Sequence, residues 1–153
     1  MDTILNLLYP QDQIFVSNPR FSVETPTVTV TCLVSGIQNY TIKRVPYITA
    51  ENYVRILSQA CYLLAHHVLG TGQIDIGLKQ DDFLRAMLDF ELYYRNLAMT
   101  FHERVGRDVP FEMTLDLKDV REIKRLGDFI IFSFANQRTV ISGEMSFVYT
   151  SHR

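Results

Sequence analysis

The sequence predicts an α+β fold in which a curved antiparallel sheet wraps around one long central helix, within a single domain that spans residues 1–153. The first observation is the segment Pro46–Leu69, which contains YITAENYVRILSQACYLLAHHVL and is apolar on most of its helical circumference. A helix that is apolar nearly all round is buried. The second observation is that strand patterns lie on both sides of this helix, which favours α+β over a doubly wound sheet.

The ends of this helix carry recognisable signals. Thr49 is the predicted N-cap, because its hydroxyl can accept a bond from an unpaired amide of the first turn. Ile48 and Tyr53 have the spacing of a hydrophobic staple around that cap. Gly70 follows the last apolar residue and suits a left-handed stop. We therefore expect the helix to run from Thr49 to Gly70.

A hairpin is predicted directly before the helix. Thr27–Val34 alternates and is rich in β-branched residues, which indicates a strand. Ser35-Gly36 is a turn signal, and Tyr40–Val45 is the predicted returning strand. A short helical turn is expected over Asp2–Leu8, ended by Tyr9-Pro10, and the segment from there to Pro26 is expected to be irregular.

The elements after the helix are a loop, a shorter helix and about four strands. The segment Tyr93–Val105 fits either helix or strand, and the alternation of Leu97, Met99 and Phe101 favours a strand in its later part. Turn signals separate the last three strands, which we expect to form an antiparallel meander. The predicted bounds are Gly70–Gly77 for the loop, Asp81–Leu92 for the helix, and Phe111–Val120, Asp128–Phe134 and Thr139–Tyr149 for the strands.

Composition excludes several classes of function. The net charge of −2 lacks the excess of positive charge that is typical of nucleic-acid-binding domains. No segment has the length of a membrane span, and no basic segment precedes the apolar residues after Met1, so we expect neither a membrane span nor a signal peptide. The expected location is the cytoplasm. Cys32 and Cys61 have apolar neighbours and are expected to be buried free thiols.

The histidines do not predict a metal site. His66 and His67 are adjacent on the helix and point in different directions, so both cannot ligate one ion well. We predict no metal and no cofactor. Alternation of the last strand places Glu144 on the face opposite Met145, toward solvent or a partner subunit.

Four local patterns between Tyr40 and Tyr149 carry a family resemblance. The first is Tyr40 itself, in the segment before the helix, and the second is Ser58-Gln59-Ala60-Cys61-Tyr62 within it. The third is an arginine six residues before a phenylalanine, and the fourth is a Ser-Gly-Glu sequence that opens the final strand. These last two patterns are Arg95 with Phe101, and Ser142-Gly143-Glu144. In order and spacing they resemble the FcoT-type long-chain fatty acyl-CoA thioesterases of the hot-dog fold.

The resemblance implies a set of site residues. In that family catalysis is attributed to tyrosine and asparagine side chains near the helix start. The strand tyrosine corresponds to Tyr40, and an N-terminal tyrosine corresponds to Tyr9. The family's asparagine falls on Thr49, where this sequence departs from the pattern, and Asn52 lies one turn further on. The hot-dog fold also implies a homodimer or higher homo-oligomer joined through a free sheet edge.

The helix start is the expected place for chemistry. Its unpaired amides and positive dipole end suit an oxyanion, which directs attention to Thr49–Tyr53. Glu51 is either an acidic residue favoured by the dipole or a general base. A stripe of side chains spaced three and four residues apart follows. It is either solvated or partner-facing, or it lines an acyl-thioester pocket; its members are Asn52, Arg55, Gln59, Tyr62 and His66.

The resulting hypothesis is hydrolysis of a fatty acyl or polyketide thioester of coenzyme A or a carrier protein. Tyr40, Thr49, Glu51 and Asn52 are the predicted catalytic residues. The predicted substrate-binding residues are Tyr9, Tyr53, Arg55, Gln59 and Tyr62. The alternative is a non-catalytic acyl-binding or assembly protein on the same fold, which the departure at Thr49 favours. A hydroxyacyl dehydratase is disfavoured because no histidine precedes His66.

Overall fold

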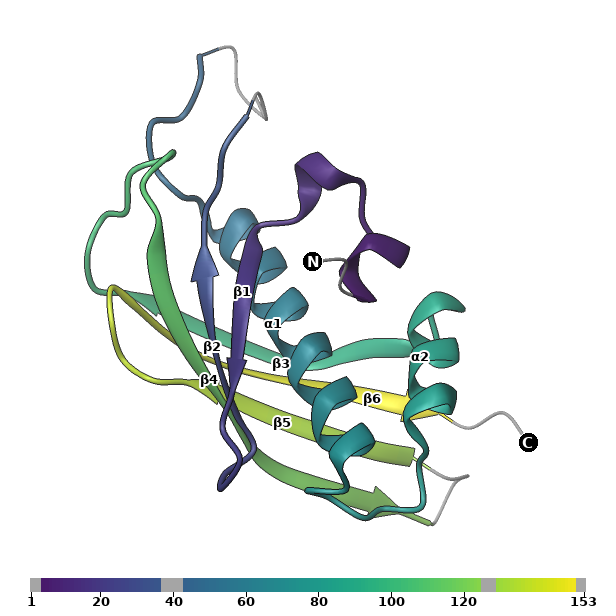
Figure 1. Cartoon of the computed structure of the whole chain (residues 1–153). Coiled ribbons are helices and arrows are strands. Elements are labelled where there is room, and N and C mark those ends of the chain that lie inside the picture. The colour runs from purple at the N-terminus through teal and green to yellow at the C-terminus, as the bar shows by residue number, and fades with distance from the viewer. Residues whose placement is uncertain (1–3, 37–42, 125–128, 151–153) are drawn as a thin grey trace.

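The computed structural model describes residues 4–36, 43–124 and 129–150. Two short 3₁₀ helices precede the first strand, a long and a short α-helix follow the second, and four strands complete the chain (Figure 1). The elements are η1 (Ile4–Leu7), η2 (Gln11–Gln13), β1 (Val16–Phe21), β2 (Thr27–Cys32), α1 (Ala50–Thr71), α2 (Gln80–Leu88), β3 (Leu92–Phe101), β4 (Phe111–Ile123), β5 (Phe129–Asn136) and β6 (Ile141–Thr150).

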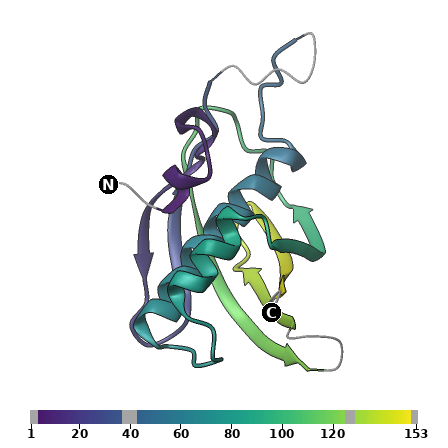
Figure 2. The ribbon, with the colours of Figure 1, turned by 90° about the vertical axis from the view of Figure 1, so that its right-hand side faces the viewer.

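The strands form one six-stranded antiparallel sheet in the order β1-β2-β4-β5-β6-β3. Helix α1, 22 residues long, crosses one face of this curved sheet (Figures 1 and 2). This is the predicted α+β arrangement, and the chain has the hot-dog fold. Strand β3 forms one edge of the sheet and β1 forms the other.

The core lies between α1 and the sheet. One face of α1 buries aliphatic side chains such as Ile56, Leu57 and Leu64 completely. Toward α2 the core is aromatic, because Phe83 of α2 packs on Phe132 and Phe147 of the sheet at ring-centroid distances of 5.8 and 6.2 Å. Cys32 and Cys61 are buried free thiols, as predicted. Burial raises the pKa of Cys32 to about 12 and raises that of Cys61, so neither is a thiolate nucleophile at neutral pH.

The start of α1 is confirmed and its end differs from the prediction. Thr49 is the N-cap, in extended conformation at φ −90° and ψ 168°. The helix continues past Gly70 to Thr71, and the left-handed C-cap is Gly72 at φ 71°. Gly70 lies against the side chain of Gln80, whose Nε2 would be 2.2 Å from a Cβ at position 70 and would have to move. That amide nitrogen donates to the carbonyl of His66 at 2.9 Å, which joins α2 to α1.

The predicted hairpin pairs the strand Thr27–Val34 with the wrong segment. Strand β2 pairs with β1, which lies in the segment expected to be irregular. The predicted returning strand Tyr40–Val45 lies partly outside the described residues, and 43–45 are not a strand. The pattern of β1 was hidden by its irregularity. The register shifts between Ser17 and Arg20, Asn18 has φ 49°, and Pro19 contributes no amide hydrogen.

The remaining elements follow their predictions closely. The second helix ends earlier than expected, at Leu88, and Phe90 then adopts a positive φ of 57°. The segment Tyr93–Val105, whose pattern fitted either helix or strand, is a strand as far as Phe101. This is β3, which includes Leu97, Met99 and Phe101. The last three strands form the expected meander. Among the described residues, no helix has both the length and the apolar character needed to cross a membrane.

Candidate active site at the start of helix α1

The side chains of Thr49 and Asn52 are occupied in a capping box. The amide of Asn52 donates to Oγ1 of Thr49 at 3.4 Å, and the amide of Thr49 donates to Oδ1 of Asn52 at 3.1 Å. The Thr49 hydroxyl also donates to that Oδ1, at 3.0 Å. Asn52 is only 2% exposed. These two residues, predicted as catalytic, therefore hold the helix start in place, and Asn52 is too buried to orient a water molecule in solvent.

The capping box leaves two backbone donors available. Within the described part of the chain, no acceptor is found for the amides of Ala50 and Glu51, the first two residues of the helix. Such amides point out of the helix start, where the helix dipole adds positive potential. They are donors of the kind that bind a developing oxyanion.

A pocket of about 620 Å³ adjoins these donors. Ile48, Thr49 and Ala50 form one wall, and the end of β3 with the loop after it forms the other. Backbone bonds fix the two walls together, since the amide of Ile48 donates to the carbonyl of Val105 at 2.9 Å. We call this the helix-start pocket; its lining residues are Tyr47, Ile48, Thr49, Ala50, Phe101, His102, Glu103, Arg104 and Val105.

The helix-start pocket contains titratable side chains that sequence reasoning did not assign to it. His102 and Glu103 line it from the end of β3. Nε2 of His102 lies 2.7 Å from the hydroxyl of Ser142 on the neighbouring strand β6. Arg104 stacks over the ring of Tyr47, with 5.0 Å between the guanidinium carbon and the ring centroid. The adjacent His-Glu pair at the end of a strand was visible in the sequence, but its place beside the helix start depends on the sheet order.

Glu51 and Tyr53 lie outside this lining. Glu51 is exposed in the first turn of α1 and does not face the pocket. Tyr53 is fully buried behind the pocket, with its ring edge-on to Phe101 at 6.0 Å between centroids. Its hydroxyl has no hydrogen-bond partner among the described residues, and burial raises its pKa. Tyr40 lies outside the described residues, so its predicted role stays a prediction.

Three of the predicted substrate-binding residues meet at a second place, one face of the middle of α1. Tyr9, Arg55 and Tyr62 lie close enough to Tyr94 of β3 to influence one another electrostatically. We call Tyr9, Tyr62, Tyr94, Arg55 and Ser58 the tyrosine cluster. Burial is the main cause that raises the pKa of Tyr9 to about 12 and also raises those of Tyr62 and Tyr94. The phenols are therefore neutral hydrogen-bond donors at physiological pH.

Ser58 in the tyrosine cluster is not a nucleophile. Its hydroxyl donates to the carbonyl of Val54 at 2.6 Å, one turn back along α1. Because a hydroxyl has a single hydrogen, the bond between Ser58 and Tyr94 is then donated by the tyrosine. Arg55 donates to the side chain of Gln13 and stacks over Phe15.

In the middle of the stripe on α1, Gln59 is covered by the N-terminal segment and not by solvent. Gln59 is completely buried, accepts from the amide of Phe15 at 2.9 Å and donates to the carbonyl of Gln13 at 2.7 Å. Its side chain therefore fastens the segment that leads into β1, and both of its polar atoms are used there. Further along, His67 stacks on Phe21 with 3.9 Å between ring centroids.

The predicted residues thus divide between two places on the helix. Tyr62 lies thirteen positions after Thr49, which is about 20 Å at 1.5 Å per residue. The helix start offers free amides, an imidazole and an open pocket. The tyrosine cluster offers neutral phenols and one guanidinium, with no acid or base among its members. Acid–base chemistry is therefore better placed at the helix start.

Comparisons with known proteins show similarity at the level of the fold. A homologue of HP0420 from Helicobacter felis superimposes with a TM-score of 0.52 at 7% identity, over 93% of this chain and 93% of that one. Cj0977, a sigma28-regulated virulence protein from Campylobacter jejuni, superimposes with a TM-score of 0.53 at 3% identity, over 95% and 90% of the two chains. No protein-family model and no curated protein matches the sequence.

One solved structure with a lower TM-score belongs to a named enzyme superfamily. A thioesterase superfamily protein from Shewanella loihica superimposes with a TM-score of 0.42 at 8% identity, over 86% of this chain and 89% of that one. Similarity at that level carries no argument about function. The function is therefore argued from the site.

Proposed function

We propose that the protein binds a fatty acyl or polyketide thioester of coenzyme A or a carrier protein in the helix-start pocket and hydrolyses it. The observation that carries this proposal is that the pocket is bounded by a helix start whose first two amides, of Ala50 and Glu51, are free of acceptors in the described part of the chain. When water attacks a thioester, the carbonyl oxygen gains negative charge. Two preorganised amide donors stabilise that charge.

His102 is the proposed general base. Its imidazole lies on the wall opposite the helix start, and Ser142 holds one of its ring nitrogens. The other nitrogen is then available to take a proton from the attacking water, and a positioned base contributes about 100-fold or more to such a step. The capping of Asn52 and the position of Glu51 outside the pocket favour His102 over both. Tyr40 remains a proposed donor to the carbonyl.

His102→Gln is expected to lower kcat/KM for thioester hydrolysis about 100-fold or more, because glutamine cannot accept the proton from water. The measurement is thiol release across acyl-CoA chain lengths and acyl-carrier substrates. His67→Gln, which removes an imidazole from the far end of α1, is the matched control and should retain activity. Turnover by the His102 variant equal to wild type would contradict the assignment of the base.

The alternative is a protein that binds acyl thioesters without hydrolysing them. The observation that favours it is that the side chains of Thr49 and Asn52 are both occupied in the cap. A wild-type protein that retains a long-chain thioester intact, with no thiol released from any substrate, would support this alternative and refute the hydrolase.

A dehydratase is the other outcome to test. The sequence disfavours a dehydratase because no histidine precedes His66. His102 lines the helix-start pocket from the end of β3, so a histidine is present there to support this alternative. Supplying 3-hydroxyacyl-CoA and following formation of the enoyl product distinguishes the two reactions.

We propose that the chain forms a homodimer through β3. This strand is a sheet edge, and it carries the exposed apolar side chains Tyr93, Tyr94, Leu97 and Phe101. An exposed apolar edge favours pairing with a second chain. Sedimentation equilibrium is expected to give twice the mass of one chain. A Leu97→Lys variant should shift the protein toward the monomer, and a wild-type monomer at micromolar concentration would contradict the proposal.

A further inference from the structure

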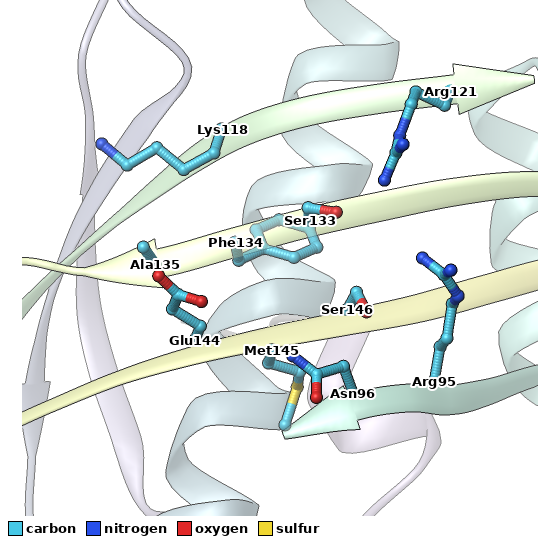
Figure 3. Close-up of a pocket in the computed structure, with 10 residues that line it drawn as sticks. All are labelled: Arg95, Asn96, Lys118, Arg121, Ser133, Phe134, Ala135, Glu144, Met145 and Ser146. Carbon is cyan, nitrogen blue, oxygen red and sulfur yellow. The ribbon is translucent and has the colours of Figure 1, made fainter. Parts of the chain in front are cut away.

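A second pocket lies on the sheet face that points away from α1. Its volume is about 500 Å³, and strands β5 and β6 form its floor (Figure 3). Ser133 and Ser146 belong to this outer face, because they alternate with Phe132, Phe134 and Phe147 of the core. We call this hollow the outer-face pocket.

Two arginines face each other across the outer-face pocket. Arg95 extends from β3 and Arg121 extends from β4, and their guanidinium groups approach one another over β5 and β6 (Figure 3). Two like charges that converge on one place repel each other, and an anion between them removes that repulsion. The planar guanidinium suits phosphate in particular, because it presents paired donors to two oxygens.

Local backbone irregularities direct the basic side chains onto this face. The register between β3 and β6 shifts at Arg95, between Tyr94 and Asn96. The register between β4 and β5 shifts at Lys118, between Leu117 and Asp119. Each shift inserts one extra residue, in β3 and in β4, and bulges commonly re-aim a side chain beside a functional site. Both extra residues are basic and both line the outer-face pocket.

The acidic groups nearby leave one end of the pocket positive. Nε of Arg121 binds Asp119 at 2.8 Å, and Lys118 binds Asp116 at 3.1 Å. Glu144 lines the pocket beside Ala135, at the end away from the two arginines (Figure 3). Arg95 has no ion-pair or hydrogen-bond partner in the described residues. Its guanidinium and the terminal nitrogens of Arg121 are therefore the groups that an anion would meet.

Two hydroxyls complete this end of the pocket. Ser133 and Ser146 pair directly across β5 and β6 and lie between the arginines (Figure 3). Ser146 is 6% exposed, and neither hydroxyl bonds to another described residue. Serine hydroxyls donate well to phosphate oxygens. The site thus combines two guanidinium groups with two unoccupied hydroxyl donors from four different strands.

We propose that the outer-face pocket binds a phosphate group between Arg95 and Arg121, with Ser133 and Ser146 as further donors. The ligand class is a phosphate monoester or a free phosphate. This site goes beyond the proposed hydrolysis and does not depend on it, since it shares no lining residue with the helix-start pocket.

Titration of the isotope-labelled full chain with inorganic phosphate tests the proposal, with chloride at equal ionic strength as the reference. The amides of Ser133 and Ser146 and Nε of Arg95 are expected to shift in NMR spectra. Arg95→Gln and Arg121→Gln should each weaken phosphate binding about tenfold, because each removes a charge-assisted pair of bonds. Arg85→Gln is the matched control, since Arg85 is an exposed ion-paired arginine on α2.

The source of the phosphate is determined by a second arm with coenzyme A. If coenzyme A shifts the same resonances, binds more tightly than inorganic phosphate and loses affinity in Arg95→Gln, the group belongs to a phosphate ester. If inorganic phosphate shifts these resonances and coenzyme A does not, the ligand is free phosphate. Either result supports the site. Absence of shifts at Ser133 and Ser146, or equal weakening by Arg85→Gln, overturns it, whatever the outcome of the thiol-release assay.

Discussion

Replacing Ala50 by proline is expected to reduce kcat for thioester hydrolysis about 100-fold to 1,000-fold while the fold is retained. Loss of one oxyanion donor has an effect of that size. Ala50 is the first residue of α1, a position where proline is favoured because the amide has no helical partner. The preceding residue, Thr49, already has the extended conformation that proline requires, with ψ 168°. The substitution therefore replaces the amide hydrogen by a ring carbon, so the donor is lost while the backbone of the helix start keeps its conformation.

Ala50→Ser is the matched control for this substitution. Serine keeps the backbone amide and adds one oxygen atom, so turnover should stay close to that of wild type. Thermal unfolding of both variants checks that the helix start is intact. An Ala50→Pro variant that is folded and fully active would show that this amide does not hold the oxyanion, and would remove the main support for chemistry at the helix-start pocket.

Gln59→Ala is expected to lower the free energy of unfolding by about 3 to 5 kcal/mol. The substitution leaves the buried amide of Phe15 and the carbonyl of Gln13 without their partner, and each such loss costs about 1–3 kcal/mol. The cavity left by the amide side chain adds to this cost. Urea unfolding measures the change, and amide exchange at Phe15 should accelerate because its acceptor is gone.

Gln11→Ala provides the comparison for Gln59. Gln11 is an exposed glutamine in η2, so its truncation should change stability by less than about 0.5 kcal/mol. If Gln59→Ala were as mild as Gln11→Ala, the N-terminal segment would be held on α1 by its apolar contacts, with Gln59 contributing little.

The sequence predicted the parts of the fold that depend on local pattern. The cap at Thr49 follows from one hydroxyl and its spacing, and the alternation of Leu97, Met99 and Phe101 gave β3 correctly. Strand β1 was missed because Asn18 and Pro19 interrupt its alternation. The end of α1 was misplaced because two glycines follow its last apolar residue. The backbone conformation identifies the cap, because Gly72 and not Gly70 adopts a positive φ.

The candidate site was predicted less completely, for a physical reason. From the sequence alone, only residues that follow Thr49 closely along the chain, such as Glu51 and Asn52, can be assigned to the helix start. The sheet order places the end of β3 against the same helix start, so His102 enters the pocket from 53 positions after Thr49. Residues brought together by strand pairing are separated in sequence, and a single sequence carries no signal of that pairing. Arg55 and Tyr62 were expected on one stripe of α1 and do share a helix face, whereas Tyr94 joins them through the sheet; their role in substrate binding stays a prediction.

The irregularity of β1 has a consequence for how far the sheet can extend. With Asn18 in the left-handed region and Pro19 lacking an amide hydrogen, the β1 edge cannot present the regular row of bonding groups that a further strand would need. In the proposed dimer, the chains join at β3. When two chains pair there across a two-fold axis, the β3 edge of each is paired and no longer exposed. The proposed assembly therefore closes at two copies, because neither chain keeps a regular exposed edge to which a third could add.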